Sequence, residues 1–279
     1  MRAPLRPAVL RRALGPVVAL CLTVLPVQAQ NTGLDELTRR EETLGWEAVG
    51  RVDIGEGGYC TGTLIATDLV LTAAHCLFDP QSGAAVDVSS LTFRAGLSDG
   101  VAIAEAQVRR AVAHPGYDPA AALSEDSVRH DVALLQLAEP IPAAVASPFV
   151  VQFPDRGTVV SVVSYARGRD NRLSWQRRCT VLGQQQGLLA FDCDVDRGSS
   201  GAPVFDRSSG RARIVSIISA GTRDGQIVSL GMVLPNLLAD LKGVLRSPPA
   251  PTAAAAAPRV RRLTAGDASR DTGARFLKP

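Results

Sequence analysis

Asp192-Cys193-Asp194-Val195-Asp196-Arg197-Gly198-Ser199-Ser200-Gly201-Ala202-Pro203 places two adjacent serines between glycines. A serine in such a turn is how acyl-transfer enzymes present a hydroxyl beside backbone N–H groups, because glycine lets the main chain approach a substrate closely. Gly/Ser pairs also mark ordinary turns, so the stretch alone predicts little. The prediction depends on two stretches further upstream.

The two upstream stretches each carry one reactive side chain. Leu69-Val70-Leu71-Thr72-Ala73-Ala74-His75-Cys76 offers an imidazole at the end of a predicted strand, and His130-Asp131-Val132-Ala133-Leu134-Leu135 offers a carboxylate beside another. The hydroxyl of serine is a poor nucleophile at neutral pH and needs a base within hydrogen-bond reach. We therefore predict that His75 is the base for a nucleophile at Ser200.

Asp131 directly precedes an apolar strand, where an unpaired carboxylate would cost on the order of several kcal/mol. Pairing with His75 would satisfy the charge, fix the imidazole tautomer and stabilise the imidazolium formed during attack. The alternative role for Asp131 is a strand cap. The other two histidines are expected to be structural, since His114 lies in a predicted turn and His130 points the other way if Asp131 begins a strand.

Together, the three stretches resemble the chymotrypsin-like (trypsin-like) serine proteases, in the bacterial branch near the glutamyl endopeptidases. The resemblance covers nearly all of residues 46–245. It implies an all-β fold of two six-stranded antiparallel barrels with a C-terminal helix, and His75, Asp131 and Ser200 in the cleft between the barrels. Ser200 would attack a peptide carbonyl, His75 would shuttle the proton, and water would hydrolyse the acyl-enzyme.

The resemblance also implies roles for residues around the nucleophile. The N–H groups of Gly198 and Ser200 would form an oxyanion hole. Ser219 and Gly221 belong to a segment that would bind an extended peptide by β-strand addition. Ser219 would also hydrogen-bond the carboxylate of Asp131.

Substrate specificity in this family depends on a pocket beside the nucleophile. Asp194, six residues before the nucleophile, matches the acidic residue at the bottom of this pocket in trypsin. A carboxylate there would favour cleavage after Arg or Lys through a charge pair. Cys193 stands seven residues before the nucleophile instead of four, so Asp194 could face solvent, and Asp192 or Asp196 is then an equal alternative. Glutamyl specificity is not expected, because Ile218 stands where that branch carries a histidine.

Activation also departs from the family pattern at Ser199. Trypsins and chymotrypsins have an aspartate immediately before the nucleophile, whereas this chain has a serine. A serine cannot accept a salt bridge from a newly cut amino terminus. The usual zymogen switch is therefore not expected.

Residues 1–29 have the composition of a secretory signal peptide. Four arginines precede an apolar run from Ala13 to Leu25, and the small-residue pattern Val27-Gln28-Ala29 follows. The run is too short to span a bilayer as a resident helix. We expect a secreted or periplasmic protein with no resident membrane segment.

Four cysteines remain when Cys21 is removed with the signal. An even number in an exported chain implies disulfides, with three possible connectivities. Neighbours in the sequence suggest Cys60–Cys76, which would pin the loop of the imidazole, and Cys179–Cys193, which would brace the approach to the nucleophile. Because no Cys-x-x-Cys or His-x-x-x-His spacing occurs, we expect no metal, and no other cofactor is expected.

Composition divides the remaining chain into segments. Residues 30–45 are polar and charged and could be a lead-in or a short propeptide cut after Arg39-Arg40. Short strands separated by turn residues predict a sandwich or barrels, and apolar residues at helical spacing predict a helix at 235–245. The resemblance implies a trypsin-like serine protease domain at 46–246, with barrels at about 46–142 and 155–234. The Pro-, Ala- and Arg-rich residues 247–279 are expected to be disordered.

The charge distribution excludes one class of partner. The formal net charge is +3, but residues 30–246 hold 20 basic and 25 acidic residues, and the excess of positive charge lies at the two ends. Without a basic stripe, no nucleic acid partner is expected. We expect a monomer that acts on proteins or peptides.

Two rival functions follow from the same residues. One is a catalytically inactive, protease-like module that holds a peptide along Ser219 to Gly221. The other is a secreted esterase, which is disfavoured because esterases usually place a Gly-x-Ser-x-Gly serine before the histidine in the sequence.

Overall fold

The computed structural model describes residues 34–247 apart from 56, 156–157, 209 and 223–226. The predicted signal peptide and the predicted disordered tail therefore lie outside the described residues. No helix within the described ranges is long and apolar enough to cross a membrane.

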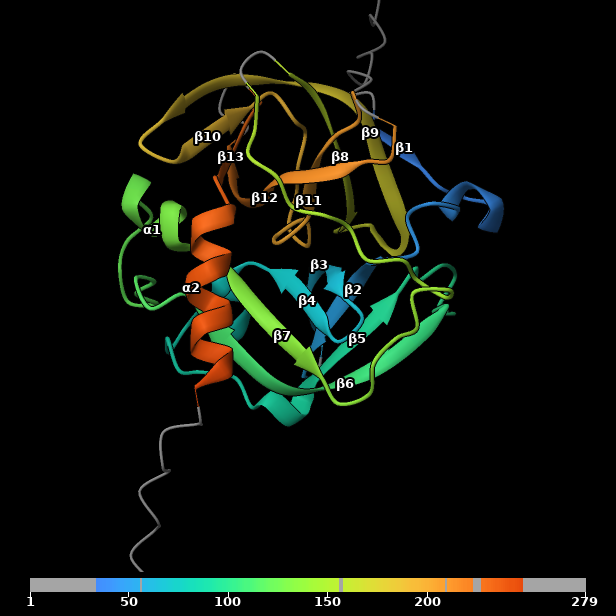
Figure 1. Ribbon diagram of the computed structural model, residues 1–279, viewed down its shortest axis with the longest axis horizontal. Coiled ribbons are helices and arrows are strands. Elements are labelled where there is room, and N and C mark those ends of the chain that lie inside the picture. The colour runs from blue at the N-terminus through green and yellow to red at the C-terminus, as the bar shows by residue number, and fades with distance from the viewer. Residues whose placement is uncertain (1–33, 56, 156–157, 209, 223–226, 248–279) are drawn as a thin grey trace, which may run out of the picture. The chain divides into compact units, whose positions relative to one another are not determined.

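The first barrel is closed by six antiparallel strands in the order β2-β3-β4-β7-β6-β5 (Figure 1). Alternation sets its interior: along β2, Gly50 and Val52 are buried, while Arg51 and Asp53 on the opposite face are only partly buried. The strands are β2 (Val49–Ile54), β3 (Gly58–Ala66), β4 (Leu69–Thr72), β5 (Leu91–Ala95), β6 (Ala104–Ala113) and β7 (Ala133–Leu137).

The second barrel follows the order β9-β10-β13-β12-β11-β8 and is closed by antiparallel pairing of β8 with β9. The predicted all-β fold of two six-stranded antiparallel barrels is therefore confirmed. The strands are β8 (Val159–Ala166), β9 (Arg169–Gln185), β10 (Leu188–Phe191), β11 (Pro203–Asp206), β12 (Arg213–Thr222) and β13 (Val228–Met232).

Helical structure is sparse, as expected, and the predicted C-terminal helix is present. The α-helices are α1 (Glu125–His130) and α2 (Pro235–Arg246), and the 3-10 turns are η1 (Arg40–Thr43), η2 (Ala74–Leu77) and η3 (Val88–Ser90). Helix α1 has no counterpart among the elements predicted from the sequence. Its signals are an N-cap at Ser124, whose hydroxyl accepts from the Ser127 amide, and acidic residues in its first turn.

Four aromatic side chains join the two barrels. The Trp46 ring lies 5.1 Å from both the Trp175 and the Phe205 rings, and Phe149 lies 4.6 Å from Phe205. Phe149 belongs to the proline-rich crossover, and its amide donates to Leu64 of β3. Aromatic residues make up only 4% of the chain, and this cluster places several of them where the barrels meet.

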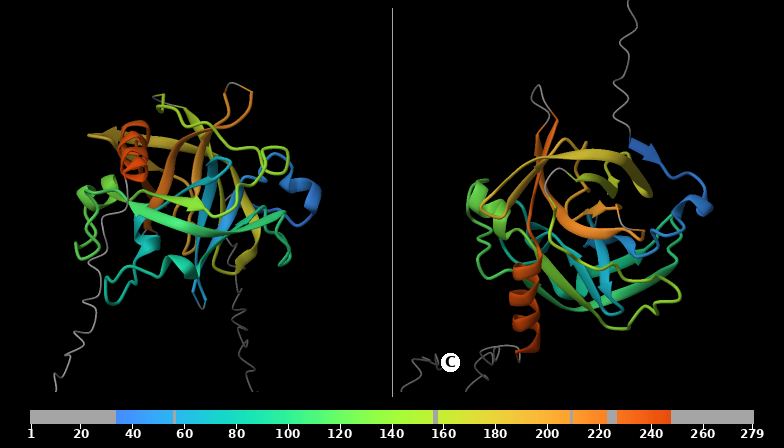
Figure 2. Two further views of the ribbon diagram at one scale, coloured as in Figure 1. Left: turned by 60° about the horizontal axis from the view of Figure 1, so that its bottom comes forward. Right: turned by 45° about the horizontal axis from the view of Figure 1, so that its top comes forward.

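Helix α2 follows the second barrel but packs on the first (Figures 1 and 2). Leu238 and Leu241 are buried in the core that contains the interior of the first barrel. The Arg110 guanidinium of β6 donates to the Val244 and Leu245 carbonyls at 3.1 and 2.9 Å. Strand β6 thus satisfies backbone groups that the end of α2 leaves without helical partners.

The segment before the first barrel packs on the second. Strand β1 (Leu34–Glu36) adds to β9, and the Leu37 amide donates to the Leu173 carbonyl at 2.8 Å. The Leu37 side chain is 2% exposed, and the Arg40 guanidinium donates to the Gly96 carbonyl at 3.0 Å. Residues 34–43, predicted to be a lead-in or a short propeptide, are packed as part of the folded domain.

A pair of leucine variants tests how far this segment stabilises the fold. We expect Leu37→Ala to lower the free energy of unfolding by about 2–5 kcal/mol, because it removes a buried side chain and leaves a cavity. Leu44→Ala, whose side chain is 70% exposed, is the matched control and should change it by less than about 0.5 kcal/mol. Denaturant unfolding measures both values. Equal, small effects would contradict an integral role for the segment.

Candidate active site

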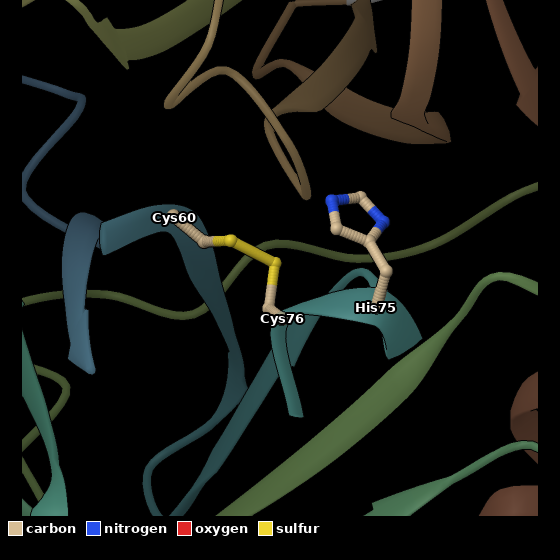
Figure 3. A group of neighbouring side chains, drawn as sticks. All are labelled: Cys60, His75 and Cys76. Atoms are coloured by element: carbon tan, nitrogen blue, oxygen red, sulfur yellow. A yellow bond between two sulfur atoms is a disulfide. The ribbon is translucent and has the colours of Figure 1, made fainter. Parts of the chain in front are cut away.

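His75 is held at the surface by a short turn and a disulfide. Turn η2 follows β4 directly, and Cys76 in this turn is bonded to Cys60 of β3 with an S–S distance of 2.02 Å. Figure 3 shows the imidazole projecting from the turn toward the loops above it, with the disulfide to its left. The side chain is 36% exposed, so one edge of the ring can meet a substrate.

Cys60, His75 and Cys76 do not form a metal site, although their donor atoms are close together. The two sulfurs and a ring nitrogen of His75 lie within 4.8 Å of one another. Cysteine binds metals as the thiolate, and both sulfurs are in the disulfide (Figure 3). Only one ligand, the imidazole, remains.

Asp131 accepts three hydrogen bonds while only 3% exposed. Its donors are the His75 Nδ1 at 2.7 Å, the His75 amide at 2.8 Å and the Ser219 hydroxyl at 2.6 Å. Asp131 caps the C-terminus of α1, and β7 begins two residues later, so it does not start a strand. His130 stacks instead on His114, with ring centroids 5.2 Å apart.

The bond to Asp131 determines the tautomer and the basicity of His75. Because Nδ1–H donates to the carboxylate, Nε2 of the neutral ring carries the lone pair. Burial lowers the pKa of His75, but the hydrogen bond and the charge of Asp131 raise it by more, so the pKa lies above its ordinary value of 6.5. The arrangement stabilises an imidazolium, as a base needs after taking a proton.

Ser200 lies in a loop that leaves two amides available. Among the described residues, the N–H groups of Gly198 and Ser200 have no hydrogen-bond acceptor, whereas the Ser199 and Gly201 amides between and after them donate at 2.9 and 2.7 Å. Gly198 has φ +93°, and a Cβ there would lie 2.3 Å from the Tyr59 ring. Only glycine fits at Gly198.

Ser200 lines both a cleft and a separate pocket. On one side, Ser200, Gly198 and His75 line a cleft of about 730 Å³. On the other, Ser200 lines a pocket of about 310 Å³ whose other walls are Val195, Asp196, Arg197, Ile218, Ser219, Ala220 and Gly221. An extended chain passing Ser200 would find space both before and after the reacting bond.

The structure brings most of the predicted site residues together. His75, Asp131, Ser219 and Ser200 are linked through hydrogen bonds or shared walls of the cleft and the pocket. In the part of the chain that the structure describes, no hydrogen bond joins the Ser200 hydroxyl to the His75 ring; the two side chains share the cleft.

Asp194 takes a different position from the one predicted. It is 5% exposed, its amide donates to the Gln176 side chain at 2.7 Å, and it is not among the described residues that line the pocket. Asp196 is the carboxylate on the pocket wall. Cys193, bonded to Cys179 of β9, ties the residue before Asp194 to the barrel strand.

Comparison with known proteins supports one family. The sequence model of the trypsin-like peptidase domain matches residues 60–213, more than half of the chain. The chain is 27% identical over 184 residues to a glutamyl endopeptidase of Bacillus licheniformis, an alignment that covers 64% of this chain and 55% of the length of that relative. It is 26% identical over 202 residues to a cercarial protease of Schistosoma mansoni, covering 67% of this chain and 69% of that relative.

Solved structures support the same fold. A Glu endopeptidase in complex with MPD superposes with a TM-score of 0.64 at 20% identity, covering 76% of this chain and 96% of that chain. The protease Anisep from Arthrobacter nicotinovorans superposes with a TM-score of 0.57 at 19% identity, covering 72% and 93%.

Titration of the imidazoles tests the geometry around Asp131. By NMR, we expect a pKa above 6.5 for His75 and a pKa below 6.5 for His114, which burial and the neighbouring His130 depress. Asp131→Asn should move the pKa of His75 below 6.5, because burial then acts without the carboxylate. Ser219→Ala keeps the carboxylate and should leave the pKa raised.

The raised pKa of His75 predicts that the stability of the fold changes with pH. A folded-state pKa above the unfolded value stabilises the fold below about pH 6.5, and this contribution is lost as the pH rises through the folded-state pKa. The loss should be absent from Asp131→Asn. An unchanged pKa of His75 in that variant would overturn the pairing as its cause.

Proposed function

The chain belongs to the trypsin-like peptidase domain family, and from this we propose that it is a serine endopeptidase that hydrolyses peptide bonds through an acyl-enzyme on Ser200. The proposal depends on one observation. Beside the Ser200 hydroxyl lie two amides, those of Gly198 and Ser200, that have no hydrogen-bond acceptor among the described residues. They share the cleft with an imidazole that is paired to a buried carboxylate.

The proposed reaction uses each group in turn. The Ser200 oxygen attacks the peptide carbonyl carbon while Nε2 of His75 accepts the hydroxyl proton, and the Gly198 and Ser200 amides bind the negative oxygen of the tetrahedral intermediate. The imidazolium then gives its proton to the leaving amine as the C–N bond breaks. Water then attacks the ester carbonyl while His75 accepts one of its protons. The acyl group leaves as the carboxylic acid product as its bond to the Ser200 oxygen breaks, and the imidazolium returns the proton to that oxygen. Asp131 keeps the ring oriented throughout.

An extended substrate would bind along Ser219 to Gly221. These residues end a strand and line the pocket beside Ser200. Main-chain pairing at such a strand gives affinity for any sequence, and the pocket selects the side chain before the scissile bond, the P1 residue.

Arg or Lys at P1 is a separate proposal, and it no longer has the support of Asp194. It now depends on Asp196, the carboxylate on the pocket wall, whose side chain is 23% exposed. Arg167 lies 3.7 Å from this carboxylate and would compete with a basic P1 side chain for its charge.

Export is the proposed location of this activity. The two disulfides, Cys60–Cys76 and Cys179–Cys193, are typical of proteins that fold in oxidising compartments. The signal predicted at residues 1–29 would direct the chain there. Fractionation of the producing cells checks the proposal: recovery of the protein in the cytoplasm with reduced thiols would contradict it.

A specific observation favours one rival function. Because no hydrogen bond joins the described side chains of Ser200 and His75, the fold could instead hold peptides without cleaving them. A fluorophosphonate probe distinguishes the two functions, since only an activated serine reacts with it.

Replacement of the nucleophile tests the enzymatic proposal directly. We expect the protein to cleave unfolded protein substrates and to bind a fluorophosphonate covalently, and Ser200→Ala to lose both, with turnover falling at least about 10⁴-fold. An unchanged melting temperature would show that the fold of the variant is intact. Cleavage at the wild-type rate by Ser200→Ala would refute the assignment.

A peptide library tests the P1 proposal. We expect cleavage after Arg and Lys, and we expect Asp196→Asn to lower kcat/KM for an Arg substrate about 10- to 100-fold relative to a Leu substrate, because a charge-assisted hydrogen bond is lost. Asn keeps an oxygen that can accept from the Arg197 amide, as Asp196 does at 2.7 Å. Asp194→Asn is the comparison and should leave the ratio unchanged. Cleavage without a basic P1 residue would exclude the proposal.

A further inference from the structure

Every carbonyl of the loop from Arg197 to Ser200 accepts a hydrogen bond. Arg197 accepts from the Arg167 amide at 2.7 Å, Gly198 from the Thr61 hydroxyl at 2.8 Å, Ser199 from the Ala202 amide at 2.9 Å and Ser200 from the Thr61 amide at 2.9 Å. The C=O and N–H of one trans peptide unit point in opposite directions. Fixing the Arg197 and Ser199 carbonyls therefore aims the N–H groups of Gly198 and Ser200 to the other side.

Thr61 is the residue that contacts this loop twice. It lies on β3, fully buried, next to the disulfide cysteine Cys60. Its hydroxyl accepts from the Tyr165 amide at 3.0 Å and lies 2.8 Å from the Gly198 carbonyl and 3.4 Å from the Tyr165 carbonyl. A hydroxyl has one proton to donate, and the shorter contact assigns it to Gly198. The hydroxyl thus connects the loop to the end of β8.

The end of β8 provides the remaining contacts. Besides the Arg167 amide, the Ser164 hydroxyl and the Tyr165 carbonyl lie 3.2 and 3.4 Å from the hydroxyl of Ser199, which is 1% exposed. These hydrogen bonds are uncharged, and they come from β8 and its turn to β9, which are in place once the barrels have folded. None uses a newly formed amino terminus.

We propose that Thr61, together with the turn at Tyr165 to Arg167, positions the loop so that the Gly198 and Ser200 amides form the oxyanion hole without an activating cut. The inference rests on the proposed function. Thr61 is a positioning residue that does not itself touch a substrate. Its hydroxyl and its amide hold the Gly198 and Ser200 carbonyls, and so fix the two peptide units that alternate with those carrying the Gly198 and Ser200 amides.

Another threonine on the same strand separates positioning from core packing. Thr63 is also fully buried, and its hydroxyl donates to the Ala48 carbonyl at 3.1 Å, within the first barrel. Thr63→Val therefore removes a buried hydroxyl with the same change of shape as Thr61→Val, but does not alter a contact of the loop.

The first experiment compares these variants by kcat and KM on a peptide substrate and by melting temperature. We expect Thr61→Val to lower kcat about 10- to 100-fold, somewhat less than loss of an oxyanion donor, with KM within about threefold. Thr61→Ser, which keeps the hydroxyl, should recover kcat to within about threefold. Thr63→Val should lower the melting temperature similarly and leave kcat unchanged. Equal loss of kcat in Thr61→Val and Thr63→Val, or an unchanged kcat in folded Thr61→Val, would overturn the proposal.

A second pair of variants removes one main-chain donor without disturbing the core. Arg167 precedes Gly168, which has φ +79°, in the two-residue turn between β8 and β9. Proline suits the first central position of a turn whose second is such a glycine. Arg167→Pro removes the N–H that binds the Arg197 carbonyl and should lower kcat relative to Arg167→Ala, which loses the same guanidinium beside Asp196 but keeps the N–H. Equal kcat in Arg167→Pro and Arg167→Ala would count against the turn as an anchor.

Hydrogen exchange keeps the inference testable if the protein lacks activity. The Ser199 amide donates to the Asp196 carbonyl just before the loop, and the Gly201 amide donates to the Ile218 carbonyl of β12. Thr61→Val should accelerate their exchange more than Thr63→Val does. If the wild-type protein is inactive but exchange is faster in Thr61→Val than in Thr63→Val, the proposed function is refuted and the positioning role of Thr61 is retained. If the wild-type protein is active but exchange is equal in the two variants, the positioning role is refuted and the proposed function is retained.

Discussion

The carboxylate of Asp131 is the constraint on which the site depends. A buried charge is tolerated when it is fully hydrogen-bonded, and here the donors come from both barrels. His75 follows β4 of the first barrel and gives two hydrogen bonds, while Ser219 in β12 of the second barrel gives the third. Satisfying one side chain therefore fixes where the strand ends of the two barrels meet, and the cleft beside Ser200 lies at that junction.

Much of the fold and the central site residues could be predicted from the sequence because their signals are local. Short strands between turn residues, together with the stretches around His75, Asp131 and Ser200, are enough to identify two β-barrels of this family. Helix α1 also has local signals, its N-cap at Ser124 and its acidic first turn. It was missed because only six residues form it and no apolar period extends over such a length.

The remaining features depend on contacts that no local pattern records. The Thr61 hydroxyl meets Gly198 across 137 positions of the sequence. Asp194 illustrates the same limit: counting back from Ser200 predicted a pocket base, yet Gln176 and the Cys179–Cys193 disulfide hold that part of the chain against β9. Spacing along the chain predicts which residue types approach a site, and packing determines which of them face it.

Each end of the folded domain packs on the barrel that is farther from it in the sequence. Strand β1 precedes the first barrel but pairs with β9 of the second, and α2 follows the second barrel but is buried against the first and held by Arg110 of β6. Neither half of the chain therefore contains all the surface that its own barrel buries. A fragment that ends in the crossover would expose the surface on which α2 packs, and a fragment that begins there would lack strand β1. The two halves should therefore melt as one cooperative unit, and they should reassociate when produced as separate fragments.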